Sequence, residues 1–116
     1  MKHHDKNKKL GRNANQRRAL LKSLACSLIR DGKITTTEAK AKELRKFIER
    51  LTTKAGKVDQ ATYKFIYSKI GNQTQTDNLI KNIAPKYIER AGGYTRIIKL
   101  PIRKSDASKM ALIEFV

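Results

Sequence analysis

Acidic residues are scarce in this chain: 10 Asp and Glu stand against 27 Lys and Arg, which gives a formal net charge of +17 on 116 residues. Solubility alone needs a far smaller net charge in a domain of this size. Self-repulsion at this charge also lowers the stability of a compact fold that is only marginally stable. The shortage of acids therefore predicts a polyanionic partner, and a nucleic acid above all.

Cysteine, tryptophan and long apolar runs are also missing or nearly so. The single cysteine, Cys26, excludes an intramolecular disulfide and fits a reducing compartment. No segment approaches the roughly 20 apolar residues of a membrane span, and no apolar stretch of the secretory type follows the basic N-terminus. At this length one modest core is expected. We predict a single domain, residues 1–116, that stays in the cytoplasm and has no membrane partner.

Few residues are suited to catalysis or metal binding. Both histidines, His3 and His4, lie in the N-terminal segment, whereas a metal site needs three or four ligands held in a fixed geometry. Cys26 has no histidine near it in the sequence, so it is expected to be a small residue on a helix face. No acids are spaced as a general acid and base, and no glycine-rich phosphate loop is present. We predict no catalytic residue, no metal, no cofactor and no small-molecule substrate, and hence no enzyme.

The N-terminal part of the chain divides into an arm and a helix. Residues 1–13 form a flexible basic arm, because Leu10 is the only sizeable apolar residue after the initiator. From about 15 to 31, apolar residues recur at steps of three and four, and Gly32 is placed to end the helix. The opposite face of this helix mixes cations with small side chains, and we expect it to approach a phosphate backbone closely.

Three further helices are predicted, so that residues 15–84 are mainly helical. The second runs from about 38 to 55, and Lys42, Lys46 and Arg50 follow one another on its outer face at four-residue steps. Like charges at this spacing repel, which hints at a bound anion. The third begins after Asp59, and the fourth follows a polar turn at 72–75 and stops at Pro85.

The C-terminal part is predicted to be a β-hairpin, residues 93–116. Residues 94–100 and 110–116 are rich in Ile, Val, Leu and aromatics and read as strands, with a basic loop between them. The β-branched stretch 34–37 is available as a third antiparallel strand. Helices followed by strands indicate an α+β fold, with the basic N-terminal arm and about four α-helices packed on a small antiparallel sheet of about three strands.

Two aromatic residues leave alternatives open. Tyr94 stands beside a glycine pair at the start of a strand, where it suits either stacking on a nucleotide or packing in the fold. Phe65 lies off the apolar face of its helix, and we expect a second packing contact there rather than a platform for a base.

A resemblance to a known family rests on motifs at both ends of the chain. The C-terminal motifs are Ala84-Pro85-Lys86-Tyr87, Arg90, Gly92-Gly93-Tyr94-Thr95-Arg96-Ile97, Asp106-Ala107 and Met110-Ala111. The N-terminal motifs are Met1-Lys2-His3, Lys9-Leu10-Gly11-Arg12, Arg17-Arg18-Ala19, Ile34-Thr35-Thr36-Thr37 and Ala39 to Arg45. Together they resemble the bacterial-type large-subunit ribosomal protein seventeen family over nearly the whole chain.

The resemblance implies a small antiparallel sheet in an α+β fold and direct contact with large-subunit ribosomal RNA. It also implies a place near the exit of the nascent-peptide tunnel, among neighbouring large-subunit proteins, as a structural constituent that supports translation. The localisation expected from it is the large ribosomal subunit in the cytoplasm.

Two groups of residues are the candidate RNA contacts. The arm and the first helix are expected to thread into RNA and neutralise phosphates, with ordering of the arm on binding. This first group is Lys2, His3, Lys8, Lys9, Arg12, Asn13, Arg17, Arg18 and Lys22. The second group, on the helical core and sheet, is Lys40, Lys42, Arg45, Tyr94, Arg96 and Lys99.

Two other function classes share the basic composition. An architectural DNA-binding protein would normally bring a dimer interface or a groove-entering arm, and the sequence has no heptad seam. A basic ribonuclease would need a catalytic histidine pair or an acid–base set on rigid elements.

Overall fold

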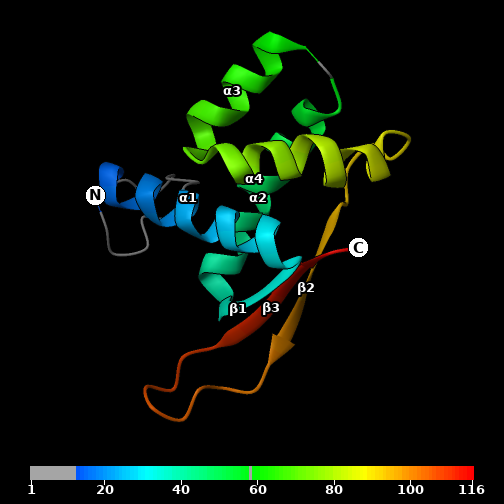
Figure 1. Ribbon diagram of the computed structural model, residues 1–116. Helices are drawn as coiled ribbons and strands as arrows, with labels where there is room; N and C mark the ends of the chain where they lie inside the picture. The colour runs from blue at the N-terminus through cyan, green and yellow to red at the C-terminus, as the bar shows by residue number, and fades with distance from the viewer. Residues whose placement is uncertain (1–12, 58) are drawn as a thin grey trace, which may run out of the picture.

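The computed structural model of the chain describes residues 13–57 and 59–116 and has an α+β architecture (Figure 1). Its α-helices are α1 (Ala14–Asp31), α2 (Glu38–Ala55), α3 (Gln60–Ile70) and α4 (Gln73–Asn78), and its strands are β1 (Lys33–Thr37), β2 (Thr95–Leu100) and β3 (Met110–Phe115). Four α-helices and a three-stranded antiparallel sheet in the described residues confirm the fold class predicted from the sequence. The predicted arm lies almost wholly outside the described residues.

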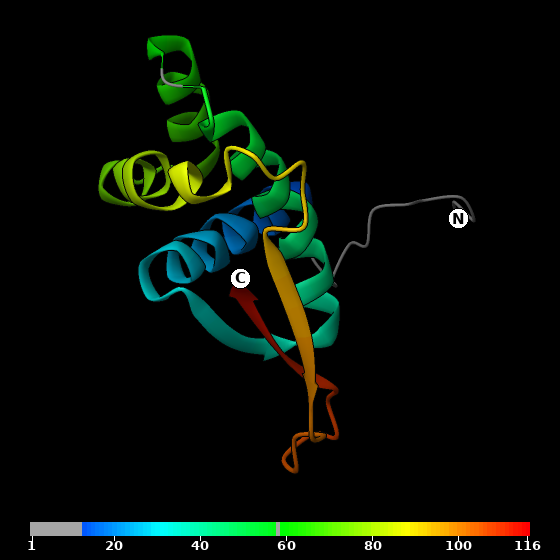
Figure 2. The ribbon, with the colours of Figure 1, turned by 90° about the vertical axis from the view of Figure 1, so that its right-hand side faces the viewer.

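The sheet has the order β1-β3-β2, so the last strand of the chain lies between the other two. Ile113 pairs with Ile34 of β1 on one side and with Ile97 of β2 on the other. These three isoleucines, one from each strand, face the core that α1 and α2 cover. The loop of the β2–β3 hairpin extends away from the helices (Figures 1 and 2).

The core consists of aliphatic side chains from every layer, as the low aromatic content predicts. Leu28, Leu44, Ile48, Ile66 and Ile113 are fully buried. Burial of a side chain of this size stabilises a fold by about 1.5–3 kcal/mol, so these five positions account for much of the stability of so small a chain. None of the described helices is long and apolar enough to cross a membrane.

Local signals in the sequence set the ends of α1. Asn13 forms a capping box with Gln16: the Asn13 Oδ1 accepts from the Gln16 backbone N–H at 2.8 Å, and the Gln16 Oε1 accepts from the Asn13 N–H at 3.2 Å. Gly32 ends the helix in the left-handed region, with φ +81°, where a side chain would be strained. Asn13, assigned to the arm from the sequence, is therefore the N-cap of α1.

The segment between α3 and the hairpin differs from the prediction. The expected polar turn is helical, because the Asn72 side chain accepts from the Gln75 N–H at 3.0 Å and caps α4. Pro85 does not end the helical segment that begins with α4. The segment widens into a π-helix, η1 (Leu79–Ile83), and then tightens into a 3-10 helix, η2 (Ala84–Tyr87). Pro85 lies in the first turn of this new helix, where its missing N–H is not needed.

The glycine-tyrosine-threonine segment before β2 is held by Glu49 of α2. The Glu49 Oε1 accepts from the backbone N–H groups of Gly93 at 3.0 Å and Tyr94 at 3.3 Å. Its Oε2 accepts from the N–H and the hydroxyl of Thr95, at 2.9 and 2.8 Å. One carboxylate thereby fastens the start of β2 to the middle of α2, so this motif of the sequence has a structural role.

Candidate nucleic-acid interface

Most of the acids among the described residues are engaged within the fold. Ion pairs join Asp31 to Arg30, Glu114 to Arg96 and Asp106 to Arg103. Glu49 holds β2, and Asp59 caps α3 by accepting from the Thr62 N–H at 2.7 Å. The net charge is +17 even with every acid counted, so a large surplus of positive charge is left for the surface.

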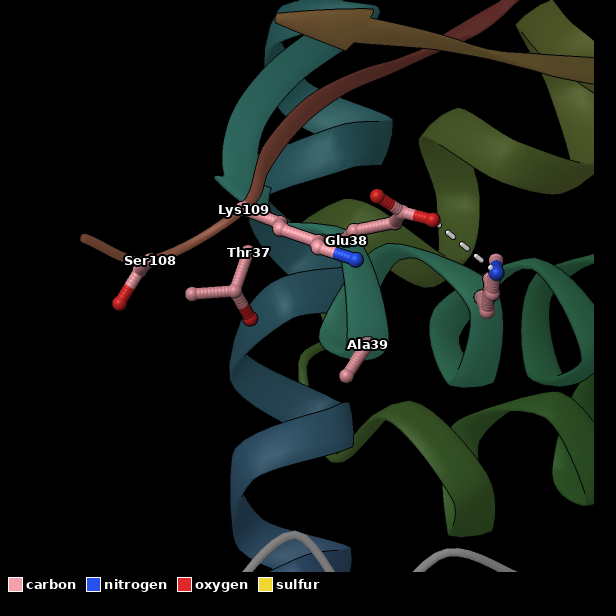
Figure 3. A pocket seen from close by; sticks show the side chains of 6 residues that line it. Thr37, Glu38, Ala39, Ser108 and Lys109 are labelled. Carbon is pink, nitrogen blue, oxygen red and sulfur yellow. Dashed lines mark ion pairs between the residues drawn. The ribbon is translucent and has the colours of Figure 1, made fainter. Parts of the chain in front are cut away.

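A first basic cluster lies where the hairpin meets the N-terminus of α2. Lys42 Nζ is 3.1 Å and Lys99 Nζ is 4.0 Å from the Glu38 Oε1. Lys109 comes from the hairpin loop and lies beside Glu38 (Figure 3). Its backbone carbonyl accepts from the Glu38 N–H at 2.8 Å. We call Lys42, Lys99 and Lys109 around Glu38 the hairpin-base cluster.

The charges in the hairpin-base cluster are unbalanced. The hydrogen bond from Lys42 lowers the pKa of Glu38, and the charges of Lys42, Lys99 and Lys109 lower it further. Three cations thus share one ionised carboxylate. Exposed ion pairs are weak, so these lysines can exchange the carboxylate for a phosphate at little cost. This arrangement suits a phosphodiester backbone that passes the base of the hairpin.

The candidate residues of β2 do not form one surface. Arg96 lies on the outer face of the sheet, where its Nε is 2.6 Å from the Glu114 Oε1. Lys99 is three residues further on and therefore lies on the other face, toward Glu38.

The structure decides between the two alternatives for Tyr94 in favour of packing. This side chain is only 3% exposed, and its hydroxyl contacts Thr53 Oγ1 at 2.9 Å and donates to the Arg90 carbonyl at 3.1 Å. Its ring packs on Tyr87, at 5.1 Å between centroids. A base cannot stack on a ring that is buried in this way.

The candidate residues of α2 also divide. Lys42 and Arg45 are three residues apart and share an exposed face, and Lys42 belongs to the hairpin-base cluster. Lys40 is half-buried and lies on a different side of the helix. The structure therefore groups Lys42 of α2 with Lys99 and Lys109 of the C-terminal hairpin, two parts of the chain that are distant in the sequence.

The candidates on α1 are partly committed to the fold. Asn13 caps the helix, and the exposed Arg18 donates to the Asn15 Oδ1 at 2.6 Å. Arg17 and Lys22 are half-buried. The remaining candidates, Lys2, His3, Lys8, Lys9 and Arg12, lie outside the described residues.

The face of α1 that was expected to approach RNA partly packs against α3. The Cys26 thiol donates to the Ile70 carbonyl at 3.8 Å. Burial raises the pKa of this thiol, and the nearby charges of Arg30 and Lys22 oppose the shift only in part. A protonated, half-buried thiol is a poor nucleophile, which agrees with the prediction that Cys26 is a small residue on a helix face and not a catalytic one. Among the described residues, no three His, Cys, Asp or Glu side chains are grouped as metal ligands.

A second basic surface, absent from the predicted contacts, lies between α2 and α3. Phe65 does not reach the core and is 38% exposed. Lys54 Nζ and Lys69 Nζ lie 4.8 and 5.6 Å from the centroid of its ring. The four-residue spacing of cations on α2, which leads to Arg50, was the one signal in the sequence that pointed toward this surface.

Comparison with known proteins identifies the same family that the sequence motifs at both ends of the chain resemble. The model of the family "Ribosomal protein L17" matches residues 20–116. A protein of Sulfurimonas denitrificans is 52% identical over 116 residues, which is all of both chains. Proteins of Nautilia profundicola and Campylobacter fetus are 49% and 48% identical, over all of this chain and 98% of theirs. Each of the three is named "Large ribosomal subunit protein bL17". The resemblance inferred from the sequence is thus confirmed, and the chain belongs to the ribosomal protein L17 family.

Proposed function

We propose that this chain is a structural constituent of the large ribosomal subunit, where it binds and stabilises large-subunit ribosomal RNA near the exit of the peptide tunnel and supports translation. The observation that carries the proposal is the full-length similarity to proteins named for the large subunit. The net charge of +17 supports RNA as the partner. Family membership also confirms the prediction that the chain is a structural protein and not an enzyme.

The proposed mechanism uses basic surfaces at both ends of α2. The hairpin-base cluster lies beside the helix N-terminus, and the Lys54–Phe65–Lys69 surface lies at its C-terminal half. Lys42 and Lys54 are twelve residues apart on this rigid helix, which is about 18 Å at 1.5 Å per residue, so the protein would brace two RNA segments at a fixed distance. The basic arm, residues 1–13, would order on a third segment and neutralise its phosphates.

The proposed partners are large-subunit ribosomal RNA and neighbouring large-subunit proteins. Ile98 on the outer face of the sheet and Ile102 in the hairpin loop are 41% and 59% exposed, which suits contact with a protein neighbour. We also propose that residues 1–116 form a single domain. The protein would act in the cytoplasm as part of the large ribosomal subunit.

Binding experiments with the pure protein test the RNA part of the proposal. Affinity for large-subunit ribosomal RNA and for duplex DNA of equal length is measured at matched salt concentrations. We expect tighter binding to the folded RNA at every salt concentration, because shape and phosphate spacing differ between the two. Equal affinity for both would indicate general binding to polyanions and contradict the proposal.

Crosslinking tests the proposed position. Ile88 is 68% exposed and suits replacement by a photoreactive residue without loss of the fold. Ribosomes carrying this variant are stalled on nascent chains of increasing length. Crosslinks that appear only once the chain is long enough to leave the tunnel support the proposal, and their absence at all lengths from several exposed positions contradicts it.

A further inference from the structure

The hollow between α2 and α3 combines an apolar floor with a basic rim. It has a volume of about 480 Å³, within the range of small-molecule sites. Its lining residues are Phe47, Arg50, Leu51, Thr53, Lys54, Phe65 and Lys69. We call it the Phe65 hollow. Three of these seven side chains are cationic and none is acidic.

The aromatic ring at the edge of the Phe65 hollow is open to a ligand. Phe65 is 38% exposed, whereas Phe47 beside it packs against the core. The ammonium groups of Lys54 and Lys69 lie over the Phe65 ring, at 4.8 and 5.6 Å from its centroid. Both are ends of flexible side chains. They can swing away from the ring face when an anion attracts them, which would free the face for stacking.

The cations of the Phe65 hollow differ from their neighbours in lacking a carboxylate. Lys42 and Lys46, on the same stripe of α2, pair with Glu38 at 3.1 Å and Glu43 at 3.5 Å. Arg50 is the next residue of the stripe, and it has no ion pair within 4.0 Å in the described residues. The same holds for Lys54 and Lys69. Positive charge therefore stays unbalanced at the rim of this hollow.

We propose that the Phe65 hollow receives one unstacked nucleotide of the bound RNA, with its base stacked on Phe65 and its phosphates held by Arg50, Lys54 and Lys69. The inference rests on the proposed function and adds a site to it. Single-stranded RNA bases stack on aromatic side chains without sequence preference, and basic groups beside the ring hold the backbone. An apolar side chain of a neighbouring protein would use the floor but leave three cations unpaired, so the charge favours a nucleotide.

The test compares variants of the full chain in binding to protein-free large-subunit ribosomal RNA over a range of salt concentrations. Phe65→Leu keeps an apolar side chain and removes the aromatic face. We expect it to weaken binding by about 5- to 150-fold, the range that corresponds to loss of one stacked base. The slope of log affinity against log salt should stay unchanged, because no phosphate contact is lost.

Two matched controls and one charge variant test whether the effect is specific to the Phe65 hollow. Phe65→Tyr retains a stacking face and should bind as the unaltered protein does. Tyr67→Leu removes an aromatic residue of the same helix that is 45% exposed but does not line the hollow, and it should leave the affinity unchanged. Lys69→Gln should lower the salt slope by about one phosphate contact. Circular dichroism checks that each variant is folded.

The outcomes separate this proposal from the proposed function. If the unaltered protein does not bind the RNA, the proposed function fails. If it binds and Phe65→Leu binds equally well, the RNA function stands and the nucleotide site is refuted. The site is also refuted if Phe65→Leu binds normally but a neighbouring protein is lost from assembled subunits, because the occupant would then be a protein side chain.

Discussion

Replacement of Glu49 by alanine should remove the hydrogen bonds that hold the start of β2 against α2. The change removes the acceptor of four hydrogen bonds, three from backbone N–H groups and one from the Thr95 hydroxyl. Hydrogen bonds to a charged group contribute about 1.5–3 kcal/mol each, but they are not additive, and exposed donors such as the Gly93 N–H regain a bond to water. We expect the free energy of unfolding to fall by about 2–4 kcal/mol.

The expected loss is large enough to measure by thermal and urea unfolding followed by circular dichroism. In a chain of this size it corresponds to a fall in Tm of roughly 10–25 °C. The free energy of unfolding of Glu49→Gln should lie between those of the unaltered protein and Glu49→Ala. The amide oxygen of the glutamine still accepts hydrogen bonds, whereas its NH2 group faces other N–H donors. We therefore expect the unaltered protein to be the most stable, Glu49→Gln to be less stable and Glu49→Ala to be the least stable. Loss of charge alone would make the two variants equally stable, because both remove one negative charge.

A control separates the hydrogen bonds from net charge. Removal of any acid raises the charge of a chain that already carries +17, and self-repulsion then lowers stability. Glu89→Ala makes the same change in charge at an exposed position between η2 and the glycine pair. It should cost less than about 0.5 kcal/mol, as surface substitutions usually do. If both alanine variants lose the same stability, Glu49 acts only through its charge, and the reasoning is refuted.

Three other changes have defined outcomes. Gly32→Ala should lower the free energy of unfolding by about 1 kcal/mol, because φ is +81° there, and Gly56→Ala, at φ −66°, should cost less; urea unfolding compares the two. Arg103 holds the pKa of Asp106 well below its usual range, with help from Ser108. The Arg103→Gln change should raise this carboxyl pKa toward about 3.9 in an NMR titration. The pKa of Asp106 is lower in the folded than in the unfolded chain, so its ionised form stabilises the fold above about pH 4, and this stabilisation is lost on acidification below it. The Arg103→Gln variant should therefore lose less stability than the unaltered protein when the pH falls. Deletion of residues 1–12, which keeps the Asn13 cap, should leave Tm nearly unchanged and weaken incorporation into large subunits; normal incorporation would refute a role for the arm.

The regular elements follow from local signals in the sequence. The apolar period of α1 and α2, the helix signals at Gly32 and Asp59, and the β-branched strand at 34–37 were all predicted and are found. Each of these signals acts within a few residues, so a single sequence reveals it. The stretch 73–78 was misread because its polar residues show no apolar period, and a proline usually ends a helix.

The parts that sequence reasoning missed depend on contacts between distant segments. Glu49 has no feature that marks it as an acceptor for residues 93–95, and Tyr94 looks the same in sequence whether it packs or stacks. Phe65 meets Lys54 only because α2 and α3 lie side by side. Composition gives the partner class, but the grouping of charges into surfaces requires the fold.

The most direct test of the central claim is sedimentation of a native lysate through sucrose gradients at low and at high salt, with the protein followed by mass spectrometry. The account predicts that it migrates with large subunits and stays with them after a high-salt wash that strips loosely bound cations. Release from the particle by salt, or migration with chromosomal DNA, would contradict it.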